Sequence, residues 1–362
     1  MKNTKKVISN IILILTILYL DFSFAQNDKQ FFRLKINKNE SKIYFSKTSF
    51  NQIQERRIIK KNIKKILEFG GIQDTILFSP SGIKTDKKGN IIVLDYVGKF
   101  VKKFTSKGKF IKKYGRPGKG PGEFMNPNRI YLDDKDSLYV YDNQNFTLTA
   151  FLKKTSQFRI KPGRLVSEFC PIDENNIIML KSSYNSFDIL EKFNIKGELL
   201  NNYESALDKT HIPQEVNFVG TMLTGNLLKL SPTRFVHIPD YLNQLFFYNN
   251  NKLEKIMSTV DKPTNPLFEL NYQSNKSMLD FRDLSEYKVN HSSFMVEKDI
   301  YVVSKRAIKG KNLIIDIYNA SNGLYKHSLQ IPIMDSFYLI HMTKNKIYMI
   351  TTDLKVKVFS YE

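Results

Sequence analysis

The chain has 362 residues, of which 41% are hydrophobic and 13% are aromatic. With 16 Gly and 12 Pro, the composition excludes collagen-like and low-complexity chains and favours a packed core. The formal net charge is +21, and the single cysteine, Cys170, excludes an internal disulfide. We therefore expect Cys170 to be a buried free thiol and the fold to be stabilised by packing alone.

The first 25 residues have the order of a secretory signal peptide. Three lysines precede a predominantly apolar stretch, 7–20, and small residues follow it at 23–25. This stretch is shorter than the roughly 20 residues that span a bilayer, and no cysteine lies nearby to carry a lipid. We expect cleavage between Ala25 and Gln26, export to the periplasm or the cell exterior in association with the cell envelope, and no transmembrane segment afterwards. An uncleaved N-terminal anchor is the alternative.

After a lead-in segment, 26–57, the sequence becomes repetitive from 58 to 362. The stretch "PSGIKTDKKGNIIVLDYVGKFVKKF" from Pro80 matches "PNRIYLDDKDSLYVYDNQNFTLTAF" from Pro127 at an offset of 47 residues. A period of roughly 40–50 residues, made of short apolar runs and turn residues, is typical of β-repeats arranged in a ring.

Each copy of the repeat predicts four strands. The run Ile91–Leu94 is apolar without alternation, so its strand must be covered on both faces. Asp95 then favours a turn, apolar and polar residues alternate over Phe100–Phe104, and a Lys-rich strand follows at Phe110–Tyr114. One such sheet cannot cover its own faces, so several must pack around a ring.

Weaker copies follow at 170–200, 227–256, 294–329 and from Phe337 to the end. They predict an all-β fold, a six-bladed β-propeller, with five or seven blades as alternatives. The last copy is one strand short, and Ile58–Gly70 resembles the missing outer strand, so we expect an N-terminal strand to close the last blade. Two stretches, 201–224 and 261–290, break the repeat and are expected on a loop face. Within the second, 277–287 predicts a short helix.

The positive charge lies largely on the predicted outer strands. It is +19 without the three lysines and one aspartate of the first 25 residues. Lysines there protect exposed sheet edges from pairing with other chains. Because we also expect export, we do not expect nucleic acid as a partner, and anionic glycans or membrane surfaces are the better candidates.

A Gly- and Pro-rich segment, "YGRPGKGPGEFMNPNRI" (Tyr114 to Ile130), connects the first two repeats. It is either a crossover that needs these residues to turn, or a ligand site in which Arg116, Lys119 and Arg129 form a positive patch near the channel mouth. The absence of a Gly-Lys-Ser/Thr run excludes a phosphate-binding P-loop.

The "GKGPGEF" run, followed by Pro127 and by strands ending in Asp, resembles the six-bladed β-propeller proteins of Bacteroidetes, relatives of the NHL-repeat propellers. The resemblance covers Ile58 to Glu362 and is strongest over the first two repeats. It implies an exported propeller that acts as a platform for ligands or partners. Some propeller relatives are metal-dependent lyases or lactonases, but their ligand residues have no match here.

The five histidines show no metal-binding spacing, and His291 and His341 are weak metal candidates because both fall near inner strands. We predict a monomeric, non-catalytic binding or scaffold protein without a cofactor, which presents a loop face to a carbohydrate, peptide or protein. Two alternatives stay open. One is a propeller-type metal-dependent hydrolase or lyase that uses Ca²⁺ or Zn²⁺ in the channel, and the other is a structural component of a cell-envelope complex.

Overall fold

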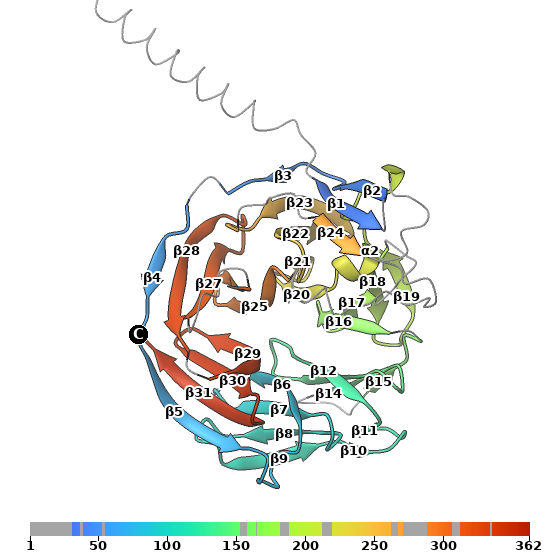
Figure 1. The fold of residues 1–362 in the computed structure, drawn as a ribbon. Coiled ribbons are helices and arrows are strands. Elements are labelled where there is room, and N and C mark those ends of the chain that lie inside the picture. Colours follow the sequence, from blue (N-terminus) through green and yellow to red (C-terminus); the bar gives the residue numbers. More distant parts are fainter. Residues whose placement is uncertain are drawn as a thin grey trace, which may run out of the picture.

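The computed structural model describes residues 31–36, 39–52, 55–152, 158–163, 165–181, 188–211, 219–261, 267–270, 288–305, 312–333 and 335–362. Six small sheets, in which strands that are consecutive in the sequence pair antiparallel, follow one another around a central axis (Figure 1). The protein is therefore an all-β, six-bladed β-propeller, as the repeat predicted. The predicted cleavage site and the predicted helix at 277–287 lie outside the described residues.

Each of the first three blades contains four strands, numbered from the channel outward. Blade 1 consists of β6 (Pro80–Thr85), β7 (Ile91–Asp95), β8 (Phe100–Phe104) and β9 (Phe110–Tyr114). Blade 2 consists of β12 (Pro127–Leu132), β13 (Leu138–Asp142), β14 (Thr147–Phe151) and β15 (Phe158–Ile160). Blade 3 consists of β16 (Val166–Pro171), β17 (Asn176–Lys181), β18 (Leu190–Asn194) and β19 (Leu199–Asn202).

The last three blades each receive a strand from the N-terminal part of the chain. Blade 4 consists of β20 (Gly225–Lys229), β21 (Arg234–Pro239), β22 (Gln244–Asn249), β23 (Lys252–Ser258) and β3 (Ser49–Phe50). Blade 5 consists of β25 (Asn290–Val296), β26 (Asp299–Ser304), β27 (Asn312–Asn319), β28 (Tyr325–Pro332) and β4 (Ile58–Lys60). Blade 6 consists of β29 (Phe337–Thr343), β30 (Lys346–Thr351), β31 (Lys355–Tyr361) and β5 (Ile63–Gly70).

The core lies between blades, which explains the apolar runs. In β7, Ile91 and Val93 pack with blade 6 residues, whereas Ile92 and Leu94 pack with blade 2 residues. All four side chains are buried. Burying both faces of a strand removes apolar surface from water on each side, so the hydrophobic effect holds neighbouring blades together.

Buried aspartates fix the turn after each of the first two runs. The Asp95 carboxylate accepts hydrogen bonds from the backbone N–H groups of Phe78, Ser79 and Gly98, at 2.6, 3.1 and 2.7 Å. The Asp142 carboxylate likewise accepts hydrogen bonds from backbone N–H groups in blade 2. A buried carboxylate is tolerated there because backbone N–H groups donate hydrogen bonds to it, and these bonds form the turn that was predicted at Asp95.

The N-terminal segment surrounds half of the ring on its outside. β5 pairs antiparallel with β31, and this pairing closes the last blade as predicted. The first residues of the predicted closing strand, Ile58–Lys60, instead form β4, which pairs parallel with β28 of blade 5. Further upstream, β3 pairs parallel with β23 of blade 4. We call the segment from Ser49 to Gly70 the belt, since it lies along the outer edges of three consecutive blades (Figure 1).

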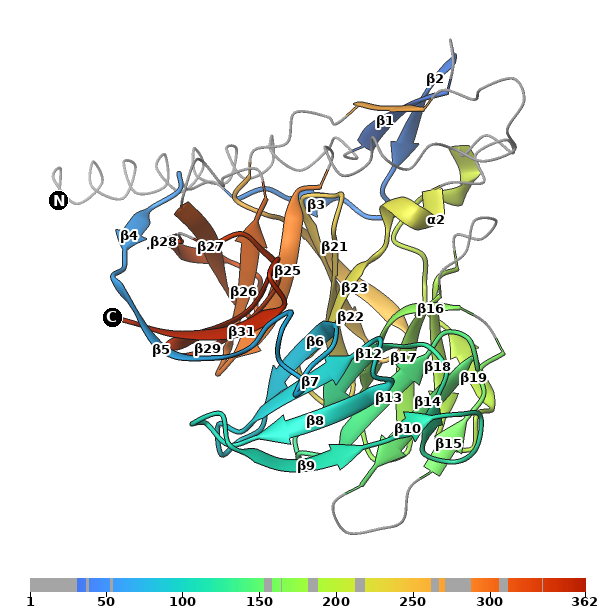
Figure 2. The ribbon, with the colours of Figure 1, turned by 60° about the horizontal axis from the view of Figure 1, so that its bottom comes forward.

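A small additional layer lies on one side of the ring (Figure 2). The hairpin of β1 (Phe31–Ile36) and β2 (Asn39–Tyr44) pairs with β24 (Leu267–Leu270) from the second insertion. The first insertion contributes the 3₁₀ turn η1 (Lys209–His211) and the short helix α2 (Val219–Met222). Both insertions therefore contribute to one face, as predicted. No helix of the described residues is long and apolar enough to cross a membrane.

Candidate functional site

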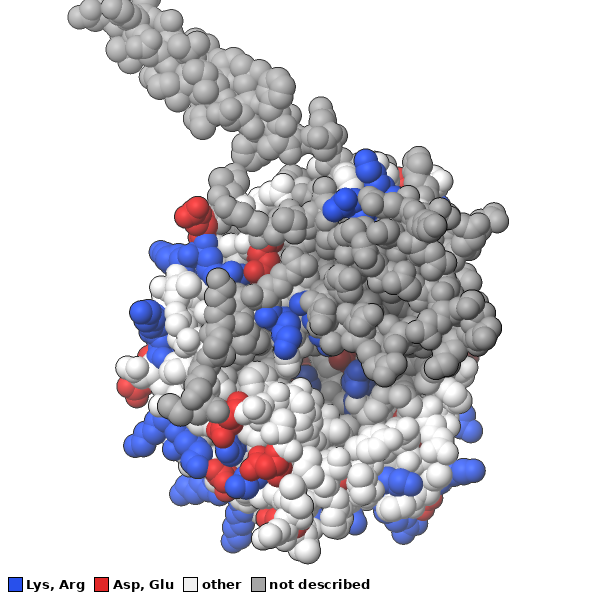
Figure 3. Space-filling view, in the orientation of Figure 1, with Lys and Arg blue, Asp and Glu red and all other residues white. Residues whose placement is uncertain are grey.

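A cavity of about 480 Å³ lies where the six inner strands meet. Residues of β6, β12, β16, β20, β25 and β29 all line it. In the space-filling view the ring is hollowed near its centre, and acidic and basic side chains lie at this hollow (Figure 3). Because Thr224 and Lys288 also line the cavity, both insertions end at its edge.

Five of the six inner strands carry a β-bulge at their second residue, where the pairing register with the next strand shifts. The bulged residues all line the cavity: Ser81, Asn128, Ser167, His291 and Tyr338. A bulge frees one residue from the strand ladder and redirects its side chain, and bulges are common beside functional sites. In this way each of the five blades places one residue with a polar side chain in the cavity wall.

Three cations and two carboxylates line the same cavity. Lys288 Nζ lies 3.0 Å from Asp240 Oδ2, so these two charges neutralise each other. Arg129 instead donates from Nε to the Ser167 carbonyl at 2.8 Å and from Nη1 to the Asn128 carbonyl at 2.9 Å. Carbonyls orient the guanidinium without cancelling its charge.

Lys84 differs from both other cations. Within the described residues its ammonium makes no hydrogen bond and no ion pair. Burial lowers its pKa, and the nearby Glu168 opposes this shift. Burial also raises the pKa of Glu168, against the opposing effects of Arg129 and Lys84. Glu168 Oε1 accepts a hydrogen bond from the backbone N–H of Phe169 at 2.9 Å.

The structure does not gather the three predicted site residues at the cavity. Arg129 on β12 lines it. Arg116 belongs to β10 (Arg116–Pro117), which pairs with β11 (Glu123–Phe124) at the outer edge of the ring (Figure 1). Its Nε lies 2.9 Å from Glu123 Oε1, and its side chain is 74% exposed. The backbone carbonyl of Lys119 accepts a hydrogen bond from Arg159 at 2.8 Å.

The Gly-rich segment is organised around Glu123 as a compact turn. Glu123 Oε2 accepts a hydrogen bond from the backbone N–H of Gly120 at 2.9 Å, in addition to the bond from Arg116. Gly115, Gly118 and Gly122 have φ values of 77°, 145° and 72°, in the region where side chains are disfavoured. These observations account for the glycines as turn residues.

The two weak metal candidates lie on inner strands. His291 Nδ1 is 2.9 Å from Ser292 Oγ, and its pKa is lowered to about 4 by burial and by Lys288 and Lys305. His341 Nε2 is 3.1 Å from Thr85 Oγ1, and its pKa is lowered to about 3 by burial and by Lys84. Both imidazoles are thus neutral near pH 7. Across the described ranges, no three His, Cys, Asp or Glu side chains come close enough to hold a metal ion.

Sequence reasoning missed Lys84, Glu168, Asp240 and Lys288. The 47-residue offset aligns two other cavity residues, Ser81 and Asn128, so the repeat signalled part of the cavity wall but not these four charged residues. Cys170 is buried and free as predicted. Burial raises its pKa to about 12, so it is an unreactive thiol at neutral pH.

Comparisons with solved structures find the same fold in Bacteroides proteins. A Bacteroides fragilis protein that is described as exported has a TM-score of 0.51 and 11% identity, over 84% of this chain and 99% of that one. A member of the DUF4221 family from Bacteroides vulgatus has a TM-score of 0.51 and 11% identity, over 85% and 99%. A protein of unknown function from Bacteroides thetaiotaomicron has a TM-score of 0.50 and 13% identity, over 83% and 76%.

A search of the curated proteins finds no match. A family model does match residues 72–331, which is well over half of the chain. The match ends within β28, so the structure adds blade 6 to what the family model covers. The chain therefore belongs to the DUF5128 family, described as a 6-bladed beta-propeller.

Proposed function

We propose that the protein is an exported, non-catalytic binding protein whose central cavity holds an anionic ligand. The observation that carries this proposal is the pair of cations Lys84 and Arg129. Both line the cavity, and among the described residues neither has a carboxylate at ion-pair distance. A ligand carboxylate would supply the missing negative charge.

The surroundings make such a charge favourable. Lys288 already pairs with Asp240, and burial raises the pKa of Glu168 against the opposing effects of Arg129 and Lys84. Charges inside a partly enclosed cavity interact more strongly than they do in water. A guanidinium that is oriented by two carbonyls can bind a carboxylate through its remaining N–H groups without first losing conformational freedom.

Binding suits these groups better than catalysis does. The Arg129 guanidinium offers N–H donors and no acceptor, so it anchors a ligand through hydrogen bonds and is not suited to act as a base. Partners of the right chemistry are carbohydrates or peptides that carry carboxylates. The signal-like order of residues 1–25 supports export, as does the similarity to a Bacteroides fragilis protein that is described as exported.

Calorimetric titration with glutarate, galacturonate and an acidic tetrapeptide tests the proposal. At least one of these anions should bind the wild type, and Arg129→Gln should weaken its binding by about 1.5–3 kcal/mol. Arg116→Gln is the matched control, because it removes the same charge from the outer edge. If none of the anions binds, or if both variants bind as the wild type does, the cavity is not an anion site.

A further inference from the structure

We propose that the anionic ligand is an acidic sugar, namely a hexuronic acid or a short sugar chain that ends in a hexuronic acid. Its carboxylate lies toward Arg129 and Lys84, and its hydroxyl groups lie against the bulged residues. This inference rests on the proposed function and names the class of ligand.

The first support is a set of polar atoms in the cavity wall that have no partner. Among the residues that the structure describes, Ser81 Oγ, Asn128 Oδ1 and Ser293 Oγ are all buried and have no hydrogen-bond partner. Ser293 is only 3% exposed. A buried polar atom without a partner is costly, so these three atoms indicate a ligand that supplies hydrogen bonds.

The chemistry of these atoms selects among anions. The oxygen of Asn128 can only accept a hydrogen bond, whereas the hydroxyl groups of Ser81 and Ser293 can donate or accept one. A ligand that only accepts, such as sulfate or a simple dicarboxylate, would leave Asn128 Oδ1 without a partner. Sugar hydroxyl groups donate and accept, and a uronic acid combines them with the carboxylate that the two cations require.

Tyr338 adds an apolar surface beside the polar groups. It is one of the bulged residues, and its side chain is 41% exposed. Its hydroxyl donates a hydrogen bond to the Pro80 carbonyl, which holds the ring in place. A fixed aromatic ring offers a face on which the C–H face of a pyranose packs. The cavity volume of about 480 Å³ lies within the range of small-molecule sites, roughly 300–1,000 Å³.

The experiment compares galacturonate, its methyl ester and glutarate by calorimetric titration of the purified protein. The ester keeps every hydroxyl group but loses the charge, whereas glutarate keeps charge and loses the ring. We expect galacturonate to bind roughly ten- to a hundredfold more tightly than either. Asn128→Ala with Ser293→Ala should weaken galacturonate binding at least about tenfold. Tyr338→Ala should also weaken it, whereas Tyr338→Phe, which keeps the ring but loses the hydrogen bond to Pro80, should weaken it less. Arg116→Gln should bind all three as the wild type does.

The outcomes separate the two proposals. If glutarate binds as tightly as galacturonate, and Arg129→Gln weakens both, the anion site stands and the sugar is overturned. If the ester binds as tightly as the acid, the carboxylate has no role and both proposals fail. Binding of galacturonate that the Asn128 and Ser293 substitutions leave unchanged overturns the assignment of the hydroxyl contacts. Thermal unfolding of each variant checks that the ring is intact.

Discussion

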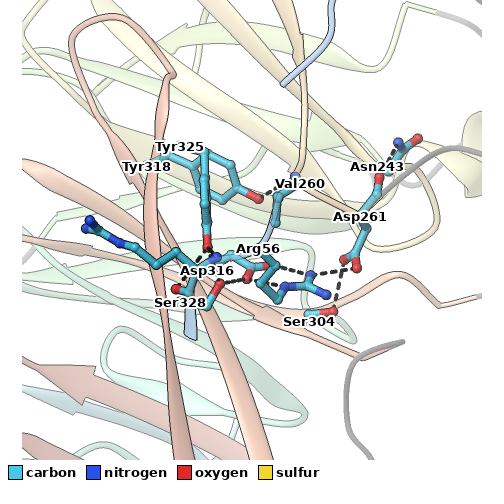
Figure 4. A network of polar contacts seen from close by, with 10 residues as sticks. Arg56, Asn243, Val260, Asp261, Ser304, Asp316, Tyr318, Tyr325 and Ser328 are labelled. Atoms are coloured by element: carbon cyan, nitrogen blue, oxygen red, sulfur yellow. Dashed lines mark hydrogen bonds and ion pairs between the residues drawn. The ribbon is translucent and has the colours of Figure 1, made fainter. Parts of the chain in front are cut away.

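Arg56 and Asp316 form a two-point ion pair that fastens the belt to the interior of blade 5. Arg56 Nε and Nη2 lie 3.0 and 2.8 Å from the two carboxylate oxygens of Asp316, whose side chain is 1% exposed. Arg56 Nη2 also lies 2.7 Å from Asp261 Oδ1, just after blade 4 (Figure 4). Ser328 and Ser304 donate hydrogen bonds to the same two carboxylates. One arginine thus joins the belt to two blades.

Arg56→Ala should destabilise the protein by about 3–5 kcal/mol, because it leaves two buried carboxylates without their cation. Arg57→Ala is the control, since Arg57 is the next residue in the belt and its side chain is exposed. Urea unfolding at pH 7 measures both. Equal midpoints for the two variants would show that the ion pair contributes little.

Deletion of residues 26–70 should lower the melting temperature by roughly 10 °C or more. The deletion removes the partner of β31 and exposes Val356 and Val358, which are buried in the closed blade. Deletion of 26–44 spares the belt and should cost less. Calorimetric scans compare the two, and an unchanged melting temperature after the longer deletion would contradict a stabilising role for closure.

The protein should lose stability as the pH falls below about 6.5. The pKa of His341 is lowered to about 3 in the folded chain, so the unfolded chain takes up the proton first. Its contribution is fully present above pH 6.5 and decreases by about 2 kcal/mol between pH 7 and pH 5. Urea unfolding at both pH values should show a smaller difference for His341→Gln. A variant with the same pH dependence as the wild type would exclude His341 as a cause.

Gly115→Ala should be more destabilising than Gly163→Ala. Both glycines have positive φ, 77° and 70°, so alanine carries a backbone cost of about 1–2 kcal/mol at either position. A Cβ at Gly115 would also clash with the buried ring of Phe124, whereas a Cβ at Gly163 meets nothing within 4 Å. The clash should add about 1–3 kcal/mol. Chemical denaturation measures the loss of stability in each variant. Equal losses would show that the Gly-rich segment adjusts to a Cβ at Gly115 without strain.

Intact-mass measurement of the exported chain should show that it begins at or near Gln26, because the charged, apolar and small residues occur in the order that signal peptidase requires. A mature chain that still contains residues 1–20 would favour the membrane-anchor alternative.

The repeat predicted the blades because each strand's pattern is local. Ile91–Leu94 specifies a strand that is covered on both faces wherever it occurs in the ring. The strand β3 was not predicted, and the residues of β4 were assigned to the closing strand of blade 6 instead of to blade 5. Both strands are short, with two and three residues, and pair with strands far away in sequence. All three residues of Ile58–Lys60 are exposed, so no alternation of buried and exposed residues marks them as part of blade 5.

The cavity was only partly predicted, and the reason is the bulges. A bulge shifts the alternation of a strand by one residue and thereby changes which side chains face the channel. Alternation along β12 therefore does not reveal that Asn128 and Arg129 both line the cavity. Arg116 was grouped with Arg129 because both belong to one Gly-rich segment, but the chain passes from the outer edge to the channel between them.

The position of the belt also determines when the ring can form. Lys355 and Glu68, whose side chains lie 2.9 Å apart across the closing pair of strands, are 287 residues apart in the sequence. The belt is synthesised before the blades, but each of its strands can pair only after its partner in one of the last three blades has been synthesised. Pairing over such distances is slow, because a long loop must close before any contact compensates for the lost entropy. A chain that lacks its C-terminal strand β31 therefore cannot reach the closed ring.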